Sequence, residues 1–328
     1  MAAFDFVVGL AALSALLTWM MIRVRILDLP NRRSSHDRPV PRAGGVAIVI
    51  TFFVGLAVVG LWSHWGLAVA ALVVAFVGFA DDLGKLGVAG KLAGQTVAAL
   101  ILIVSGVVLR DISQIPVGVL GYAITFVWLV GMTNLVNFMD GLDGLAGGTG
   151  AIAALGFAVL ALTASPDAAR LAAALGAGCV GFSIFNVPKA RIFMGDVGSE
   201  FLGFLLAALA VLGAGEGGHT SFLVMPLLMF HFIFDTCFTF CRRLMDGENV
   251  TRAHRGHLYQ LMNRLGATHL QVSLFHWAIG LAQAVGAYVM LSISGVERLL
   301  VFVPFLAFEA AYAVVVMQAV KRRAITPG

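Results

Sequence analysis

The sequence has 328 residues, of which 60% are hydrophobic and only 12% are charged, with a formal net charge of +4. Soluble domains average about 45–50% apolar and about 25% charged residues. The composition therefore excludes a disordered chain, a secreted disulfide scaffold and an ordinary cytosolic enzyme. The three cysteines lie inside apolar runs without metal-binding spacing, which disfavours a zinc or disulfide site. We expect one integral membrane domain over 1–328, with no separate soluble domain.

Eleven apolar stretches are candidates for transmembrane helices, although several fall short of the roughly 20 residues that a span needs. In chain order they are Phe4–Ile22, Gly45–Trp62, Leu67–Ala80, Leu92–Leu109, Gly118–Met132, Leu145–Thr163, Leu171–Phe185, Phe201–Leu212, Phe222–Cys241, Val272–Ile293 and Leu299–Val320. Polar residues at the stretch ends would extend the short ones. The sequence thus predicts an all-α polytopic membrane protein with about 11 transmembrane helices.

The distribution of Lys and Arg predicts the orientation. With the N-terminus outside, all but three of the 21 Lys and Arg residues fall in cytoplasmic connections or in the C-terminal tail, the exceptions being Arg110, Arg170 and Arg298. We therefore expect an outside N-terminus, which would be periplasmic if the membrane is a bacterial inner membrane, and a cytoplasmic C-terminus. The first stretch is not expected to be a cleaved signal peptide, because its positive charges follow the apolar run.

Acidic residues gather at the ends of three predicted helices on the cytoplasmic side. Asp81 and Asp82 follow the third span, Asp140 and Asp143 follow the fifth, and Asp196 follows the seventh. Carboxylates near membrane depth are costly and usually face a cavity or a partner. A single pair would fit a solvated helix cap, but three sites on one face favour a divalent cation with oxygen ligands. We expect Mg²⁺, with Mn²⁺ as a substitute.

The surroundings of these acids point to phosphate chemistry. Glycines that allow close backbone approach follow Asp140 and flank Asp196, and Lys189 and Arg191 lie nearby. His254 and His257 stand three residues apart in a run rich in arginine, where they would bind a phosphate or donate a proton. Carboxylates for Mg²⁺ with basic groups for phosphate oxygens are what phosphoryl transfer requires. A site at the membrane suggests that one substrate is a lipid.

A secondary transporter is the alternative class, because intramembrane acids can carry coupling ions. Only Asp235 and Glu309 lie well inside predicted spans. The other acids stand at span edges, which disfavours transport. Asp235 has no assigned role at this level.

Six segments carry a resemblance to a known family. They are SSHDRPVPRAGG (34–45), FADDLGKL (79–86), KLAGQ (91–95), NLVNFMDGLDGLAGG (134–148), FNVPKARIFMGDVGSEFLG (185–203) and HRGH (254–257). Together they resemble the polyprenyl-phosphate N-acetylhexosamine-1-phosphate transferases, or glycosyltransferase family 4, which includes the phospho-N-acetylmuramoyl-pentapeptide transferases. The resemblance covers essentially the whole chain, in family order and with the family's topology.

The resemblance implies roles for particular residues. Catalytic roles are implied for Asp81, Asp82, Asp140, Asp143, His254 and His257, with Asp81 or Asp82 deprotonating the acceptor phosphate. Substrate contacts are implied for Lys91, Asn137, Asn186 and Phe193, where Phe193 would stack on uracil. Arg255, beside the two histidines, is expected to contact phosphate. Mg²⁺ would be held by Asp196, with Asp82 beside it.

The reaction implied is transfer of an N-acetylhexosamine 1-phosphate from a UDP-sugar to undecaprenyl phosphate, which yields undecaprenyl-diphosphate-sugar and UMP. No nucleic acid partner is implied, and a homodimer is compatible with the family. HRGH departs from the run of adjacent histidines in the muramoyl-pentapeptide transferases and looks more like the enzymes that start O-antigen or capsule chains. The resemblance leaves the sugar and any covalent intermediate open.

Overall fold

The computed structural model of the chain describes residues 3–24, 26–28, 39–215, 220–249 and 254–325. These residues are mostly helical, and short strands form two small antiparallel pairs. Seven of the helices are long and apolar enough to cross a membrane, and three shorter apolar helices accompany them. The chain is therefore an all-α, multi-pass membrane protein. Arg32, Arg33 and Arg38, which belong to the Lys and Arg residues expected on the cytoplasmic side, lie outside the described residues.

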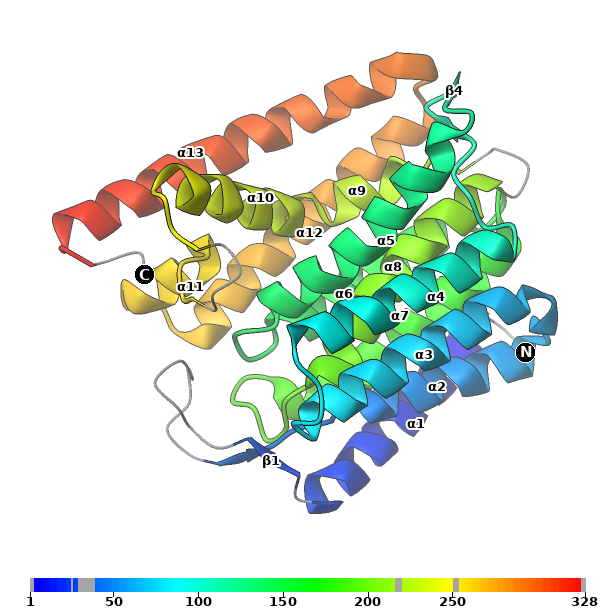
Figure 1. Cartoon of the computed structure of the whole chain (residues 1–328), viewed down its shortest axis with the longest axis horizontal. Helices are drawn as coiled ribbons and strands as arrows, with labels where there is room; N and C mark the ends of the chain where they lie inside the picture. The colour runs from blue at the N-terminus through cyan, green and yellow to red at the C-terminus, as the bar shows by residue number, and fades with distance from the viewer. Residues whose placement is uncertain (1–2, 25, 29–38, 216–219, 250–253, 326–328) are drawn as a thin grey trace.

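The elements follow one another in a simple order along the chain (Figure 1). The helices are α1 (Ala3–Val24), α2 (Gly45–Val59), η1 (Trp62–His64), α3 (Trp65–Asp82), α4 (Val88–Val104), α5 (Leu120–Met139), α6 (Leu145–Ala161), α7 (Pro166–Asn186), α8 (Asp196–Gly215), α9 (Val224–Leu228), α10 (Phe230–Met245), α11 (Leu258–Arg264), α12 (His269–Leu291), η2 (Gly295–Val301) and α13 (Phe302–Arg322). The strand pairs are β1 (Leu27–Asp28) with β2 (Val40–Pro41), and β3 (Asp111–Ile112) with β4 (Ile115–Pro116).

Helix α8 forms the centre of the bundle. In its most apolar 18-residue segment, 94% is buried inside the protein, against 17% for the corresponding segment of α1. It packs against α2, α3, α5 and α7. Small residues allow this close packing: a Cβ on Gly45 of α2 would overlap the backbone of Gly198. The first residue of this central helix is Asp196, so the fold places that carboxylate at the middle of one end of the bundle.

The structure corrects the predicted ninth span. Phe222–Cys241 is not one helix, because the chain breaks at Met229 between the short α9 and α10. Several other helices are longer than predicted; at the site, α5 continues to Met139 and α8 begins at Asp196. The number of membrane crossings and the orientation stay predictions.

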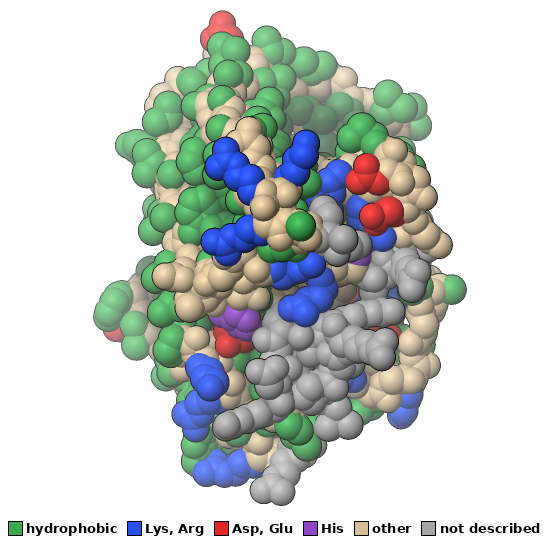
Figure 2. All heavy atoms as spheres, turned by 90° about the vertical axis from the view of Figure 1, so that its left-hand side faces the viewer, with side chains coloured by type: hydrophobic (Ala, Val, Ile, Leu, Met, Phe, Trp, Pro, Cys, Tyr) green, Lys and Arg blue, Asp and Glu red, His purple; other side chains and the backbone are tan. Residues whose placement is uncertain are grey.

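The ends of α3, α5, α7 and α10 and the beginnings of α4, α6, α8 and α12 lie at the same end of the bundle (Figure 1). The beginning of α1 and the end of α13 lie at opposite ends of the molecule (Figure 1). Figure 2 looks at the end that carries these connections and shows many Lys and Arg side chains there. The predicted acidic sites therefore lie at the same end of the bundle as these Lys and Arg side chains, which we call the basic rim.

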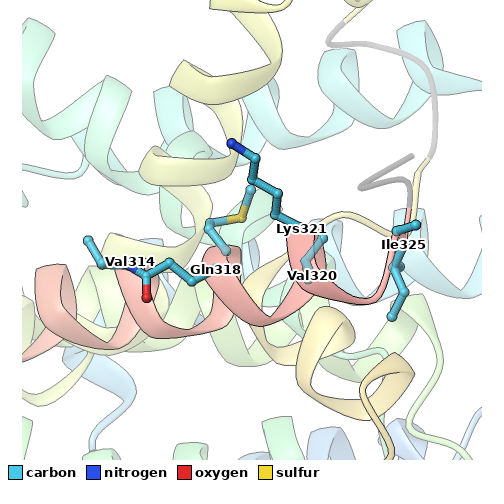
Figure 3. A pocket seen from close by; sticks show the side chains of 7 residues that line it. Val314, Gln318, Val320, Lys321 and Ile325 are labelled. Atoms are coloured by element: carbon cyan, nitrogen blue, oxygen red, sulfur yellow. The ribbon is translucent and has the colours of Figure 1, made fainter.

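A second, smaller apolar cluster joins the last helices. Leu258 and Leu261 of α11 are buried against Ala313, Val316 and Val320 of α13. An apolar groove runs along the last turns of α13, and Figure 3 shows Gln318 and Lys321 as the polar side chains among those that line it. The groove lining contains no carboxylate or imidazole, which makes it a poor candidate for chemistry.

Candidate active site

Asp82, the last residue of α3, caps the beginning of α8. Its Oδ1 accepts a hydrogen bond from the Asp196 backbone N–H at 3.0 Å, and its Oδ2 accepts one from Val197 at 3.1 Å. A carboxylate at a helix N-terminus satisfies unpaired N–H groups and complements the helix dipole. Gly195 makes this approach feasible, since it has φ of +74° and its Cβ would lie 2.6 Å from Asp82 Oδ2. Asp82 therefore fixes the position of Asp196.

The Lys91 ammonium group lies among three carboxylates. Its Nζ is 2.5 Å from Asp196 Oδ2, 2.8 Å from Glu200 Oε1 and 3.2 Å from Asp81 Oδ2. The Asp81 and Asp196 carboxyl groups also lie within hydrogen-bonding reach of each other. We refer to Asp81, Lys91, Asp196 and Glu200 as the carboxylate cluster. Such a concentration of negative charge requires a cation to compensate it.

Asn137 connects α5 to the same cluster. Its Nδ2 donates to Asp196 Oδ1 at 3.0 Å and to Ser199 Oγ at 2.9 Å. Asn134, one turn earlier, instead donates to Gln95 Oε1 of α4 at 2.6 Å. Asp140 does not continue the helix, because α5 stops at Met139 and Asp140 follows as its C-terminal cap residue.

Asp140 differs from the other acids of the site. Within the described part of the chain no group donates a hydrogen bond to its carboxylate, although the group is close to the charges of Asp82, Asp143 and Asp196. Burial, together with these like charges, raises the pKa of Asp140 to about 7. Its carboxylate is thus available to a ligand.

Asp143 and Asn186 hold the loops around the site. Asp143 Oδ2 accepts from the Ala190 backbone N–H at 3.0 Å, and its Oδ1 is 3.2 Å from His269 Nδ1. Asn186 Oδ1 accepts from Gly144 N–H at 2.6 Å, while its Nδ2 donates to the Ile192 carbonyl at 2.8 Å. The Asn186 side chain is buried and committed to backbone. Its predicted substrate contact stays a prediction, and its visible role is to join the two loops.

Phe193 is half-buried in the loop before α8. Its backbone N–H donates to the Pro41 carbonyl at 2.8 Å, and its carbonyl accepts from Gly44 at 2.9 Å. The loop is thereby tied to the segment after β2. The predicted stacking of the Phe193 ring on uracil stays a prediction.

The HRGH segment lies beside the end of α5. The rings of His254 and His257 stack with centroids 5.0 Å apart, and His257 lies 6.4 Å from the ring of Phe138. The Tyr259 hydroxyl donates to the Phe138 carbonyl at 2.9 Å, two residues before Asp140. Burial, then the neighbouring histidine and two arginines, lower the pKa of His254 to about 4. Arg255 is half-buried, and its carbonyl accepts from Arg264 at 3.3 Å.

The carboxylate cluster offers a hard divalent cation the right kind of donor, although among the described residues no three His, Cys, Asp or Glu side chains stand close enough together to hold a metal ion as they are. Its donors are all carboxylate oxygens, which Mg²⁺ prefers, and the Lys91 ammonium already stands between them as a cation. Asp196 and Asp81 would hold the metal. Asp82 fits less well than predicted, because both of its oxygens accept backbone N–H groups of α8.

Several residues that the structure places at the site are not predicted from the sequence. Glu200 lies one turn after Asp196 on α8, and the spacing of four was the available signal. His269 of α12 contacts Asp143. Asp235, left without a role, is bonded to His257. No local pattern indicates the last two contacts, because their partners are distant in sequence.

Fold and site together define a multi-pass membrane protein with a carboxylate-rich polar centre at one end of its bundle. The sequence profile of glycosyl transferase family 4 matches residues 64–214. The chain belongs to this family.

Curated relatives extend the match beyond those residues. A probable undecaprenyl-phosphate N-acetylglucosaminyl 1-phosphate transferase of Bacillus subtilis is 29% identical over 283 residues, which cover 83% of this chain and 79% of the relative. The phospho-N-acetylmuramoyl-pentapeptide-transferase of Moorella thermoacetica is 32% identical over 277 residues, covering 77% and 85%. That of Heliobacterium modesticaldum is 37% identical over 224 residues, covering 61% and 68%.

Proposed function

We propose that the chain transfers an N-acetylhexosamine 1-phosphate from a UDP-sugar to undecaprenyl phosphate, as the first step of O-antigen or other cell-surface polysaccharide synthesis. The observation that carries the proposal is the carboxylate cluster at the beginning of α8, where Lys91 lies within ion-pair distance of Asp81, Asp196 and Glu200. The relatives' names, which specify polyprenyl-phosphate and phospho-sugar transfer, support the reaction class.

In the proposed reaction, an oxygen of the lipid phosphate attacks the β-phosphorus of the UDP-sugar. A new O–P bond forms to the lipid, the bond from that phosphorus to the bridging oxygen breaks, and UMP leaves with the bond's electron pair. A Mg²⁺ held by Asp196 would neutralise charge on the diphosphate. Lys91 would neutralise phosphate oxygens as well, and Asp81 is the carboxylate placed to take a proton from the acceptor, since Asp82 holds α8.

The donor side of the site is formed by α5 and the loop that follows it. Asn137 orients Asp196 through a 3.0 Å hydrogen bond, and Asp140 presents a carboxylate that the described residues leave without a donor. We assign the sugar or ribose hydroxyls to Asp140, because hydroxyl groups would supply the hydrogen bonds that it lacks. His257 and Arg255 would contact the diphosphate.

An apolar groove supports a lipid acceptor. It has a volume of about 700 Å³ and runs between α5 and α10, from Trp128 and Phe222 to Phe138. Phe138 lies two residues before Asp140, so the groove reaches the polar site at one end. A polyprenyl chain in the groove would bring its phosphate to the carboxylates. The basic rim at this end of the bundle (Figure 2) would face the cytoplasm, where UDP-sugars are available.

The proposal is tested by UMP release from the purified protein with undecaprenyl phosphate, Mg²⁺ and a panel of UDP-N-acetylhexosamines. Release that requires lipid, metal and one donor supports the reaction and identifies the sugar. Folded protein that releases no UMP with any donor, yet takes up a solute in proteoliposomes, would overturn the proposal in favour of the transporter alternative.

A further inference from the structure

Asp235 is a buried carboxylate of α10 that the proposed reaction does not use. Its exposed fraction is 1%, and four donors surround it. Oδ1 accepts from the Thr239 hydroxyl at 3.1 Å and from the Leu258 N–H at 2.9 Å, and it lies 3.1 Å from His257 Nδ1. Oδ2 accepts from the Tyr259 N–H at 3.0 Å. One side chain thus holds the beginning of α11 and the ring of the residue before it.

This arrangement determines which nitrogen of His257 carries a proton. An ionised carboxylate only accepts hydrogen bonds, so the imidazole must donate through Nδ1–H. Nε2 makes no hydrogen bond to the part of the chain that the structure describes. In the neutral imidazole that nitrogen carries a lone pair, and when the ring is protonated it becomes a second donor.

The contact also places His257 relative to the rest of the site. The Tyr259 hydroxyl, two residues on, bonds the Phe138 carbonyl at 2.9 Å, and a Cβ on Gly141 would overlap that hydroxyl. Asp235 therefore connects α10 to the end of α5, where Asp140 follows. Movement of the α11 N-terminus would displace His257 from that loop.

We propose that Asp235 is a positioning residue for His257: it fixes the Nδ1–H form of the ring and leaves Nε2 for a phosphate oxygen or a proton of the substrate. The inference rests on the proposed function for the substrate, and on geometry alone for the pairing. The pattern of a carboxylate that orients a histidine is a general means of setting a tautomer.

A double-mutant cycle tests the proposal through activity. Asp235→Asn should lower kcat roughly 10²-fold, the size expected for loss of an oriented acid–base group, with little change in KM for the donor. His257→Gln should cost a similar factor, and the double variant should lose no more than either single variant. Glu309→Gln is the matched control, because it makes the same acid-to-amide change in a residue 1% exposed on α13, and should keep wild-type kcat.

If the loss of kcat in the double variant equals the product of the two single-variant losses, Asp235 acts independently of His257, and the proposal is overturned. Retention of wild-type kcat by Asp235→Asn would do the same. A wild-type protein that releases no UMP would instead count against the proposed function, and the pairing is then tested by a measurement that needs no turnover.

That measurement is ¹⁵N NMR of the histidine rings in the full-length protein, with the His257 signals assigned from their loss in His257→Gln. We expect a protonated Nδ1 in the wild type. In Asp235→Leu, with the fold checked by unchanged signals of His64, which pairs with Asp167, and of His269, which pairs with Asp143, the protonation of Nδ1 should change. An unprotonated Nδ1 in the wild type, or the same signals in Asp235→Leu, would contradict the pairing.

Discussion

Lys91 Nζ and Asp196 Oδ2 lie 2.5 Å apart. Lys91 lies in the first turn of α4 and Asp196 is the first residue of α8, and the two stand 105 positions apart in sequence. Lys91 is also within ion-pair distance of Asp81 and Glu200. The ammonium group thus compensates a charge cluster that the fold gathers at the beginning of its most buried helix. Most of the following expectations depend on this cluster.

Asp196→Asn should reduce turnover by about 10²- to 10³-fold, because it removes the central anionic ligand of the proposed Mg²⁺ while keeping the size of the side chain. UMP release at saturating donor and lipid measures the effect. Asp167→Asn is the control, since Asp167 pairs with His64 and Arg170 away from the cluster. Equal activity of Asp196→Asn and wild type would remove Asp196 from the reaction.

Lys91→Met should destabilise the protein, because it leaves buried carboxylates without their cation, a loss of roughly 3–5 kcal/mol for a broken buried pair. In chelator, Lys91→Met should therefore melt at a lower temperature than the wild type. Added Mg²⁺ should raise the melting temperature of the variant more than that of the wild type. Lys85→Met, on the exposed turn after α3, should melt like the wild type. An equal Mg²⁺ response of Lys91→Met and wild type would argue against a cation site at the cluster.

Gly195→Ala should lower both stability and activity, because the new Cβ would meet the Asp82 carboxylate at 2.6 Å and push it from the α8 N-terminus. Gly84→Ala is a matched comparison: its φ of +70° is similar, but a Cβ there meets open space. It should cost only the roughly 1–2 kcal/mol of the left-handed conformation. Similar melting temperatures and activities for the two variants would contradict the role of Asp82.

Asp140→Asn should stabilise the metal-free protein at high pH. The pKa of Asp140 is raised to about 7, so the folded state binds the proton more tightly than the unfolded state and loses stability as pH rises toward 7. The advantage of the variant should grow between pH 5 and pH 7 to roughly 2–4 kcal/mol and then level off.

Melting curves in chelator at several pH values test this expectation. Asp143→Asn, which weakens contacts to Ala190 and His269, should be less stable than the wild type at pH 8. A stability difference between Asp140→Asn and wild type that does not vary with pH would show that Asp140 titrates normally.

The sequence allowed the end of the bundle that carries the site to be predicted, because the acids follow the third, fifth and seventh apolar stretches and odd connections face the same side. Lys91 and Asn137, for which the resemblance implies substrate contacts, both contact Asp196, its implied metal ligand, and their roles stay predictions. Glu200 received no predicted role, because the eighth apolar stretch begins only at Phe201, whereas α8 begins at Asp196 and includes Glu200 one turn later.

Long-range contacts could not be predicted in this way. Nothing near Asp235 indicates that it meets a loop 22 residues later, because that contact depends on the break at Met229 and the direction of α10. Pro226, which disfavours a continuous helix, is the local signal that a uniform ninth span overlooks. Likewise, the DD pattern does not indicate that Asp81 faces Lys91 while Asp82 caps α8.

The identity of the nucleotide product tests the central claim most directly. Purified protein would be incubated with undecaprenyl phosphate, Mg²⁺ and the UDP-sugar that it accepts. The nucleotide and lipid products would then be separated, identified and quantified by mass spectrometry. Attack on the β-phosphorus predicts UMP and undecaprenyl-diphosphate-sugar in equal amounts. Formation of UDP with a lipid that carries only one phosphate would mean that the sugar alone is transferred, and would contradict the account.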